Sequence, residues 1–216
     1  MKLTVFGATG GVGREVVRQA LDAGHEVTAV VRDPARLPVP AHERLRVAVV
    51  PDLTDESALV PVLTGQSAVI STLGSPSNKQ ARLTPVTGPA VRAIVAAMAQ
   101  AGVSRLAAVS AAPVGPDVPG DGVLARKVFL PLLRRALRDL YADLAVMEAV
   151  IRSSDIRWTV VRPPRLLNRP GTGRYRRVIG ANVPGARVIA RADVADALLA
   201  CLTDPSTFDR PVGVAD

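Results

Sequence analysis

The stretch GATGGVG at residues 7–13 decides the fold of this chain. It lies between an apolar run, Leu3 to Phe6, and a helical pattern that starts near Gly11. A diphosphate needs backbone N–H groups aimed at it, a helix N-terminus behind it and no Cβ in between. Glycines between a strand and a helix meet these needs, although the spacing G-x-x-G-x-x-G is one residue longer than the usual fingerprint. The stretch therefore predicts a turn that binds a dinucleotide.

Each glycine of this turn has a distinct expected role. Gly7 permits the tight turn after the strand, Gly10 allows a close approach to the diphosphate, and Gly13 lets the helix pack against the strand. The alternative is a turn with a purely structural role. The residues that we expect to contact the cofactor here are Gly7, Thr9, Gly10, Gly11, Val12 and Gly13.

The rest of the chain alternates short β-branched runs with longer helical patterns, which is typical of βαβ units. Strands are predicted at 3–6, 27–31, 47–50, 68–73, 106–110 and 158–161. Helices are predicted at 11–23, after Thr54 or Asp55, at 84–101, within 124–153 with a break near 140–141, and at 193–202. The pattern predicts an α/β fold with one doubly wound parallel sheet, helices on both faces and a small C-terminal region that covers the substrate.

We expect one domain over residues 1–216, with a cofactor-binding half at 1–110 and an acceptor-side half at 111–216. The segment 162–185 is predicted to be irregular. A loop rich in proline and glycine is predicted at 111–122, and whether it is a lid stays open.

The end of the second predicted strand suggests which dinucleotide is bound. An NAD site usually places a carboxylate there for the ribose hydroxyls, whereas an NADP site places an arginine that matches a 2′-phosphate. Here Arg32 and Arg36 bracket the position. Asp33 could serve the ribose, but a role as turn residue or helix cap is favoured. The pattern favours NADP(H) over NAD(H).

Three further strand ends are expected to line the same cleft, because ligands bind outside the carboxyl ends of such strands. Asp52 and Leu53 follow the third strand and either flank the adenine or serve the turn. Leu73 and Gly74 follow the fourth, where Gly74 would let the chain pass close to the cofactor. Ser110 ends the fifth. Its hydroxyl either contacts the nicotinamide or acceptor, or caps the strand end.

The composition excludes several classes of protein. Apolar residues make up 48% and aromatic residues 3% of the 216 residues, so the core must be built from aliphatic side chains. The net charge is +8, but only three lysines occur, and no basic stretch is interleaved with aromatic residues that stack on bases. Arg134, Arg135 and Arg138 are expected on a solvated helix face. We therefore expect no binding to nucleic acid.

Membrane and metal sites are also not expected. No apolar run approaches the ~20 residues of a membrane span, and no leader pattern is present at the start. Cys201 is the single cysteine and is expected in the core, which fits a reducing cytoplasm. His25 and His42 have no partners that would make a metal site. Glu148 is expected to face solvent or to pair with Arg152.

Taken together, these motifs resemble the atypical short-chain dehydrogenase/reductase superfamily, and more narrowly its flavin reductase branch, which includes the beta-type biliverdin reductase. The resemblance covers essentially the whole chain. It is carried by FGATGGVG, EVTAVVRDPARLP, STLGS, AVSAA, WTVVRPPRL, RPGTGRY and VIARADVADALLACLTDP. It implies NADPH in the cleft and a flat acceptor, such as a flavin or a tetrapyrrole, stacked on the nicotinamide. FMN or FAD would then be a substrate rather than a prosthetic group.

The resemblance also implies roles for particular residues. Ser110 falls where the branch has a serine near the nicotinamide, and Pro163 and Pro164 fall on its proline pair beside the cofactor. Arg165 stands where the biliverdin reductase carries a histidine, which leaves the acceptor open. We expect Arg165, together with Leu166, on the acceptor side. The branch leaves a monomer or a weak homo-oligomer as the expected state.

One departure from the wider superfamily concerns proton transfer. Members that reduce carbonyl groups use Tyr-x-x-x-Lys, in which the lysine lowers the tyrosine pKa. Here Tyr141 is followed at that spacing by Ala145, so we expect Tyr141 to be a packing residue. This disfavours alcohol or sugar dehydrogenation and epimerisation. Two hypotheses stay open: an NADPH-dependent reductase of flat acceptors, and a redox sensor that binds NADP(H) and regulates a protein partner without turnover.

Overall fold

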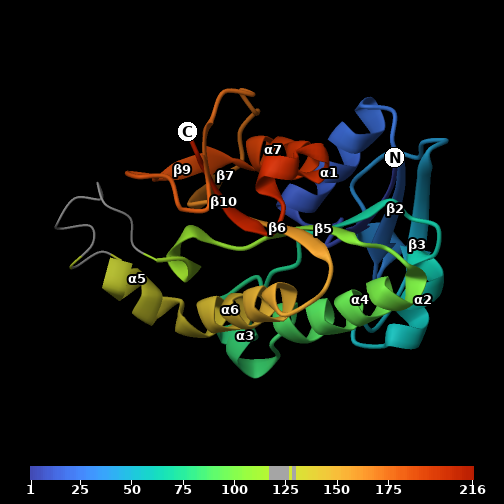
Figure 1. Ribbon diagram of the computed structural model, residues 1–216, viewed down its shortest axis with the longest axis horizontal. Helices are drawn as coiled ribbons and strands as arrows, with labels where there is room; N and C mark the ends of the chain where they lie inside the picture. Colours follow the sequence, from blue (N-terminus) through green and yellow to red (C-terminus); the bar gives the residue numbers. More distant parts are fainter. Residues whose placement is uncertain (117–126, 128–129) are drawn as a thin grey trace.

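An eight-stranded sheet runs through the protein in the order β3-β2-β1-β4-β5-β6-β10-β8 (Figure 1). A computed structural model describes residues 1–116, 127 and 130–216. All neighbouring strands are parallel except β10 and β8, which are antiparallel. The strands are β1 (Lys2–Phe6), β2 (Glu26–Val31), β3 (Leu45–Val49), β4 (Ala68–Ser71), β5 (Arg105–Val109), β6 (Arg157–Arg162), β8 (Arg176–Ile179) and β10 (Arg210–Ala215).

Helices cover both faces of this sheet (Figure 1). One face carries α1 (Gly11–Asp22) and α7 (Arg191–Thr203). The other carries α2 (Glu56–Leu63), α4 (Thr87–Ala101) and α6 (Arg138–Arg152), with the shorter α3 (Asn78–Leu83) and α5 (Leu130–Ala136) beside α6. This doubly wound arrangement confirms the predicted fold class.

The side chains of each central strand point alternately into two apolar cores, one on each face of the sheet. In β1, Leu3 and Val5 pack toward α1 and α7, whereas Phe6 packs toward α2, α4 and α6. In β4, Ile70 faces the first core and Val69 the second. Because successive side chains point to opposite faces and both faces are covered, these strands read as continuous hydrophobic runs.

The C-terminal third contains strands that the sequence did not reveal. The predicted irregular segment 162–185 holds β7 (Arg165–Leu167) and β8 (Arg176–Ile179), and β10 follows the last helix. β7 pairs in parallel with β9 (Val188–Ala190) in a separate two-stranded ribbon. The prediction of an irregular segment is therefore wrong. Strands of three or four residues are too short to show a periodic signal in the sequence.

Two helix boundaries also differ from the prediction. The helix predicted from residue 84 begins at Thr87 as α4, and a separate short helix, α3, precedes it. The break predicted near 140–141 lies at Leu137 instead. The start of α4 is set by Asp143 of α6, whose carboxylate accepts N–H groups of Val86, Thr87 and Gly88 at 3.2, 2.9 and 2.8 Å. This cap comes from another helix, so no local signal announces it.

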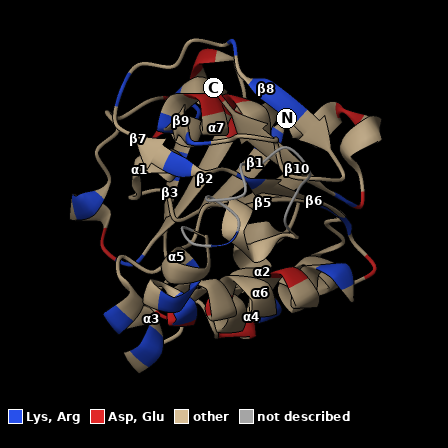
Figure 2. Ribbon diagram, turned by 90° about the vertical axis from the view of Figure 1, so that its left-hand side faces the viewer, with Lys and Arg blue, Asp and Glu red and all other residues tan. Residues whose placement is uncertain are grey.

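The distribution of basic residues and the character of the helices relate to the expectations about nucleic-acid and membrane binding. Lys and Arg segments lie on both helical layers and on the outer strands (Figure 2). Among the described residues, no helix combines the length and the apolar character needed to cross a membrane. Residues 117–122 of the predicted loop lie outside the described residues, as do 124–126, 128 and 129 of the predicted helical segment.

Candidate functional site

The glycine turn follows β1 and is held by its own backbone. The Gly7 carbonyl accepts the N–H of Gly10 at 2.9 Å, and Gly7 has a φ of +77°, which favours glycine. A Cβ on Gly7 would lie 2.8 Å from the Thr72 backbone, and a Cβ on Gly13 would lie 2.1 Å from the Gly7 carbonyl oxygen. Gly7 and Gly13 are therefore required by the packing of β1, β4 and α1.

Gly10 and the start of α1 are arranged differently. Gly10 is exposed, and a Cβ there would meet only the Gly7 oxygen, at 3.2 Å. No side chain among the residues that the structure describes caps α1 at Gly10, so the amides at the start of this helix are left without a capping partner there. Thr9 is exposed beside them, whereas the Val12 side chain is buried in the core. A helix start of this kind suits an anion.

The end of β2 presents two arginines to solvent. Arg32 and Arg36 are exposed, and among the described residues their side chains form no ion pair or hydrogen bond. Asp33 instead accepts the N–H of Ala35 at 3.0 Å and caps the short 3-10 helix at Pro34–Arg36. Asp33 therefore serves the turn, and the two guanidinium groups are available for a phosphate.

The carboxyl ends of β3 and β4 lie at the same edge of the sheet, with β2 and β1 between them. The Asp52 carboxylate accepts the N–H and the hydroxyl of Thr54 at 2.8 and 2.7 Å, and these bonds lower the pKa of Asp52. Leu53 and Leu73 are half-buried against the core on the α2 side. A Cβ on Gly74 would meet no atom within 4 Å, so the chain there borders open space.

Ser110 lies at the carboxyl end of β5, beside the end of β6. Its N–H donates to the Val161 carbonyl at 2.8 Å, and the Pro163 carbonyl accepts the N–H of Ala112 at 2.9 Å. Ser110 is 5% exposed, and its hydroxyl has no hydrogen-bond partner among the described residues. A buried unpaired hydroxyl costs about 1–3 kcal/mol, so this group is suited to bonding a ligand.

Two side chains from distant parts of the chain hold the segment after Ser110. Asn182 donates to the carbonyls of Ala112 and Pro116 at 2.8 and 3.2 Å. Arg134 of α5 donates to those of Pro113 and Gly115 at 3.0 and 3.1 Å. The expectation that Arg134 lies on a solvated face is therefore wrong, because backbone carbonyls of the 111–116 segment need donors. No sequence signal marks Asn182 for this role.

The residues expected on the acceptor side lie just beyond β6. Pro163 is buried and Pro164 half-buried, and the chain then enters the β7–β9 ribbon. Arg165 is exposed on that ribbon, and Leu166 packs partly against the core under α1 and α7. The structure therefore brings Ser110 and the proline pair together, with Arg165 and Leu166 on the strand that follows.

Glu148, Tyr141 and Cys201 lie away from this edge, and their side chains are buried or half-buried. Glu148 is 3% exposed and pairs with both Arg152 and Arg162. The expected Arg152 pair is confirmed, but a solvent-facing Glu148 is wrong because α6 buries it against β6. Tyr141 of α6 packs partly against the core, and burial raises its pKa. Cys201, on the core-facing side of α7, is fully buried, as expected.

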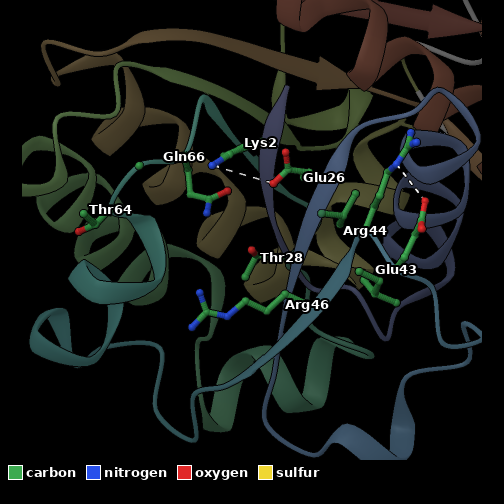
Figure 3. Close-up of a pocket in the computed structure, with 11 residues that line it drawn as sticks. Lys2, Glu26, Thr28, Glu43, Arg44, Arg46, Thr64 and Gln66 are labelled. Carbon is green, nitrogen blue, oxygen red and sulfur yellow. Dashed lines mark ion pairs between the residues drawn. The ribbon is translucent and has the colours of Figure 1, made fainter.

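A hollow of about 590 Å³ lies at the opposite edge of the sheet, near the amino ends of β1, β2 and β3 (Figure 3). The side chains around it form the ion pairs Lys2–Glu26 and Arg44–Glu43. Ligands of doubly wound sheets bind at the carboxyl ends of the strands, so we place the candidate site at the other edge. Within the described part of the chain, no three potential metal ligands cluster.

The strand order, the glycine turn and the open start of α1 together define a Rossmann-type dinucleotide-binding protein. Comparison with known families agrees, because the profile of the NAD(P)H-binding family matches residues 7–205. The chain belongs to this family.

Solved structures with the same fold include several oxidoreductases. A wide-type short-chain dehydrogenase/reductase from Veillonella parvula in complex with NADP has a TM-score of 0.81 at 20% identity, covering 100% of this chain and 94% of that one. ChuY, an anaerobillin reductase from Escherichia coli O157:H7, has a TM-score of 0.79 at 22% identity, covering 100% and 97%. A curated relative, photosystem II assembly factor Ycf39 of Guillardia theta, is 58% identical over 33 residues, only 15% of this chain and 10% of that protein.

Proposed function

We propose that the protein is an NADPH-dependent reductase that transfers a hydride to a flavin or a similar flat conjugated acceptor. The observation that carries the proposal is the buried hydroxyl of Ser110, which has no hydrogen-bond partner in the described part of the chain and lies at the strand end beside Pro163. It lies at the edge of the sheet that bears the glycine turn, where ligands of this fold bind. In this role Ser110 is the catalytic residue, because it contacts the reacting rings.

The residues at this edge fit a phosphorylated dinucleotide. The uncapped start of α1 at Gly10 and Gly11 would hold the diphosphate through backbone N–H groups. Arg32 and Arg36 would hold a 2′-phosphate, which supports a preference for NADP(H). Asp52, Leu53, Leu73 and Gly74 would border the adenosine part, and Ser110, Pro163 and Pro164 the nicotinamide part.

The hydride comes from the bound nicotinamide, so little acid–base work is left to the protein. The chain must hold two flat rings in contact and keep water out. Asn182 and Arg134 support this by fixing the 111–116 segment on which the position of Ser110 depends. Tyr141 is packed against the core, and Ala145 replaces the lysine that would activate it. This favours a conjugated ring over a carbonyl group as acceptor.

Oxidation of NADPH and NADH with FMN, FAD or riboflavin, followed by nicotinamide absorbance, tests the proposal. We expect saturable turnover with NADPH preferred. Ser110→Ala should lower kcat/KM roughly three- to tenfold, the effect of one neutral hydrogen bond. Ser153→Ala, at an exposed serine after α6, is the matched control and should not change it. Tight NADPH binding without turnover on any flat acceptor would instead favour a redox sensor that regulates a protein partner.

A further inference from the structure

Arg191 lies against the glycine turn although it belongs to the other end of the chain. It is the first residue of α7, which packs beside α1 on the same face of the sheet (Figure 1). A Cβ on Gly11 would lie 2.6 Å from both Cδ and Nε of Arg191. The Arg191 side chain therefore covers the first residue of α1, where backbone N–H groups are uncapped.

The electrostatic setting of Arg191 is unfavourable without an anion. Helix N-termini carry a partial positive charge, and Arg191 lies at those of both α1 and α7. Across the described ranges, no carboxylate forms an ion pair with Arg191. Asp193, the acidic residue in the first turn of α7, accepts instead the N–H groups of Thr172 and Gly173 at 2.8 and 2.9 Å. A bound anion would offset this concentration of positive charge.

Asn168 holds Arg191 in place. Leu167 and Ala190 are paired across the β7–β9 ribbon, so the next residues, Asn168 and Arg191, leave it side by side. Nη1 of Arg191 donates to Oδ1 of Asn168 at 2.6 Å. Because the acceptor is an uncharged amide oxygen, it orients the guanidinium without neutralising it.

We propose that Arg191 binds the diphosphate of the dinucleotide and that Asn168 is its positioning residue. The inference rests on the proposed dinucleotide site and adds to it a cation supplied by the acceptor-side half of the chain. Arg191 would act on the diphosphate, which all dinucleotides share, whereas Arg32 would act only on the 2′-phosphate. Loss of Arg191 should therefore weaken every dinucleotide, whereas loss of Arg32 should weaken only those with a 2′-phosphate.

Titrations of NADPH, NADH and ADP-ribose against the full chain separate these roles. Arg191→Gln should weaken all three ligands by a similar factor, roughly tenfold or more, as for hydrogen bonds to a charged group. Arg191→Lys should restore part of the loss. Asn168→Ala should weaken binding less, and it should add nothing in the Arg191→Gln background, because it acts only through Arg191. Arg210→Gln, an exposed arginine at the amino end of β10, is the charge-matched control and should bind as wild type.

Each outcome has a definite meaning. Wild-type affinity of Arg191→Gln for all three ligands would overturn the diphosphate role, and a loss confined to NADPH would assign Arg191 to the 2′-phosphate instead. An Asn168→Ala effect that persists without Arg191 would overturn the positioning role. A wild-type protein that binds ADP-ribose through Arg191 but reduces no acceptor would refute the proposed reductase and leave this inference intact.

Discussion

Glu148 of α6 and Arg162 at the end of β6 form a buried, bidentate ion pair. Nε and Nη2 of Arg162 lie 2.9 and 2.5 Å from the two carboxylate oxygens, and both residues are 3% exposed. Arg152 adds a second contact to Glu148 at 2.7 Å. Since Pro163 follows Arg162 directly, the pair ties α6 to the strand end that carries the proline pair.

Removing Glu148 should therefore destabilise the protein strongly. Glu148→Ala leaves the Arg162 charge buried without its partner, and we expect a loss of about 3–5 kcal/mol in the free energy of unfolding. Urea denaturation measures it. Glu43→Ala, which removes an exposed partner of Arg44, is the control and should cost under about 1 kcal/mol. Similar small losses for both variants would show that the buried pair contributes little.

Cofactor preference should depend on Arg32. Arg32→Ala is expected to weaken NADPH binding by about 1.5–3 kcal/mol, the range for a charged hydrogen bond, and to leave NADH nearly unchanged. Isothermal titration with both cofactors measures this. Arg46→Ala, at an exposed arginine near the amino end of β3, is the control. Equal losses for NADPH and NADH would refute a contact with the 2′-phosphate.

The glycines of the turn should separate by role. Gly10→Val places a Cβ 3.2 Å from the Gly7 carbonyl oxygen, a tight contact but a milder one than the 2.1 Å approach at Gly13. It should therefore abolish cofactor binding and lower the melting temperature less than a substitution at Gly13. Gly13→Ala drives a Cβ into the Gly7 carbonyl and should lower the melting temperature itself. Thermal melts and NADPH titrations of both variants check this. Retained affinity in Gly10→Val would contradict the phosphate-binding assignment.

Tyr141 should be dispensable for the chemistry. Its ring is packed against the core and lacks an activating lysine, so Tyr141→Phe keeps the packing and removes only the hydroxyl. Steady-state turnover should stay close to wild type. A collapse of kcat in a variant with normal thermal stability would show that Tyr141 transfers a proton.

Cys201 should report on opening of the α7 layer. Burial raises the pKa of its thiol, and the thiolate is the reactive form, so a thiol reagent should modify the native protein only through unfolding. Bound NADPH stabilises the native state and should slow the modification further. Absorbance of a chromogenic thiol reagent follows the rate, with urea-unfolded protein as the reference. Native modification as fast as in the unfolded protein would contradict the burial of this side chain.

Much of the frame could be predicted because its signals are local. The strand before Gly7, the turn and α1 follow from adjacent residues, and the Asp33 cap follows from turn chemistry. Both faces of the central strands are buried, so their composition revealed a doubly wound sheet. The same local logic placed Arg32 and Ser110 at strand ends, because parallel strands end at one edge.

What the sequence by itself determined is therefore the order of the main elements and the edge at which a dinucleotide would bind. Only the tertiary structure decided which distant side chains meet there. Asn182 reaches the segment after Ser110, Asp143 caps α4, and Arg191 covers Gly11. Each contact joins residues from separate elements, and its partner is specified by three-dimensional packing rather than by spacing along the chain. Short strands such as β7 and β9 belong with these contacts, since a strand of three residues carries no periodic signal of its own and forms by pairing with the other.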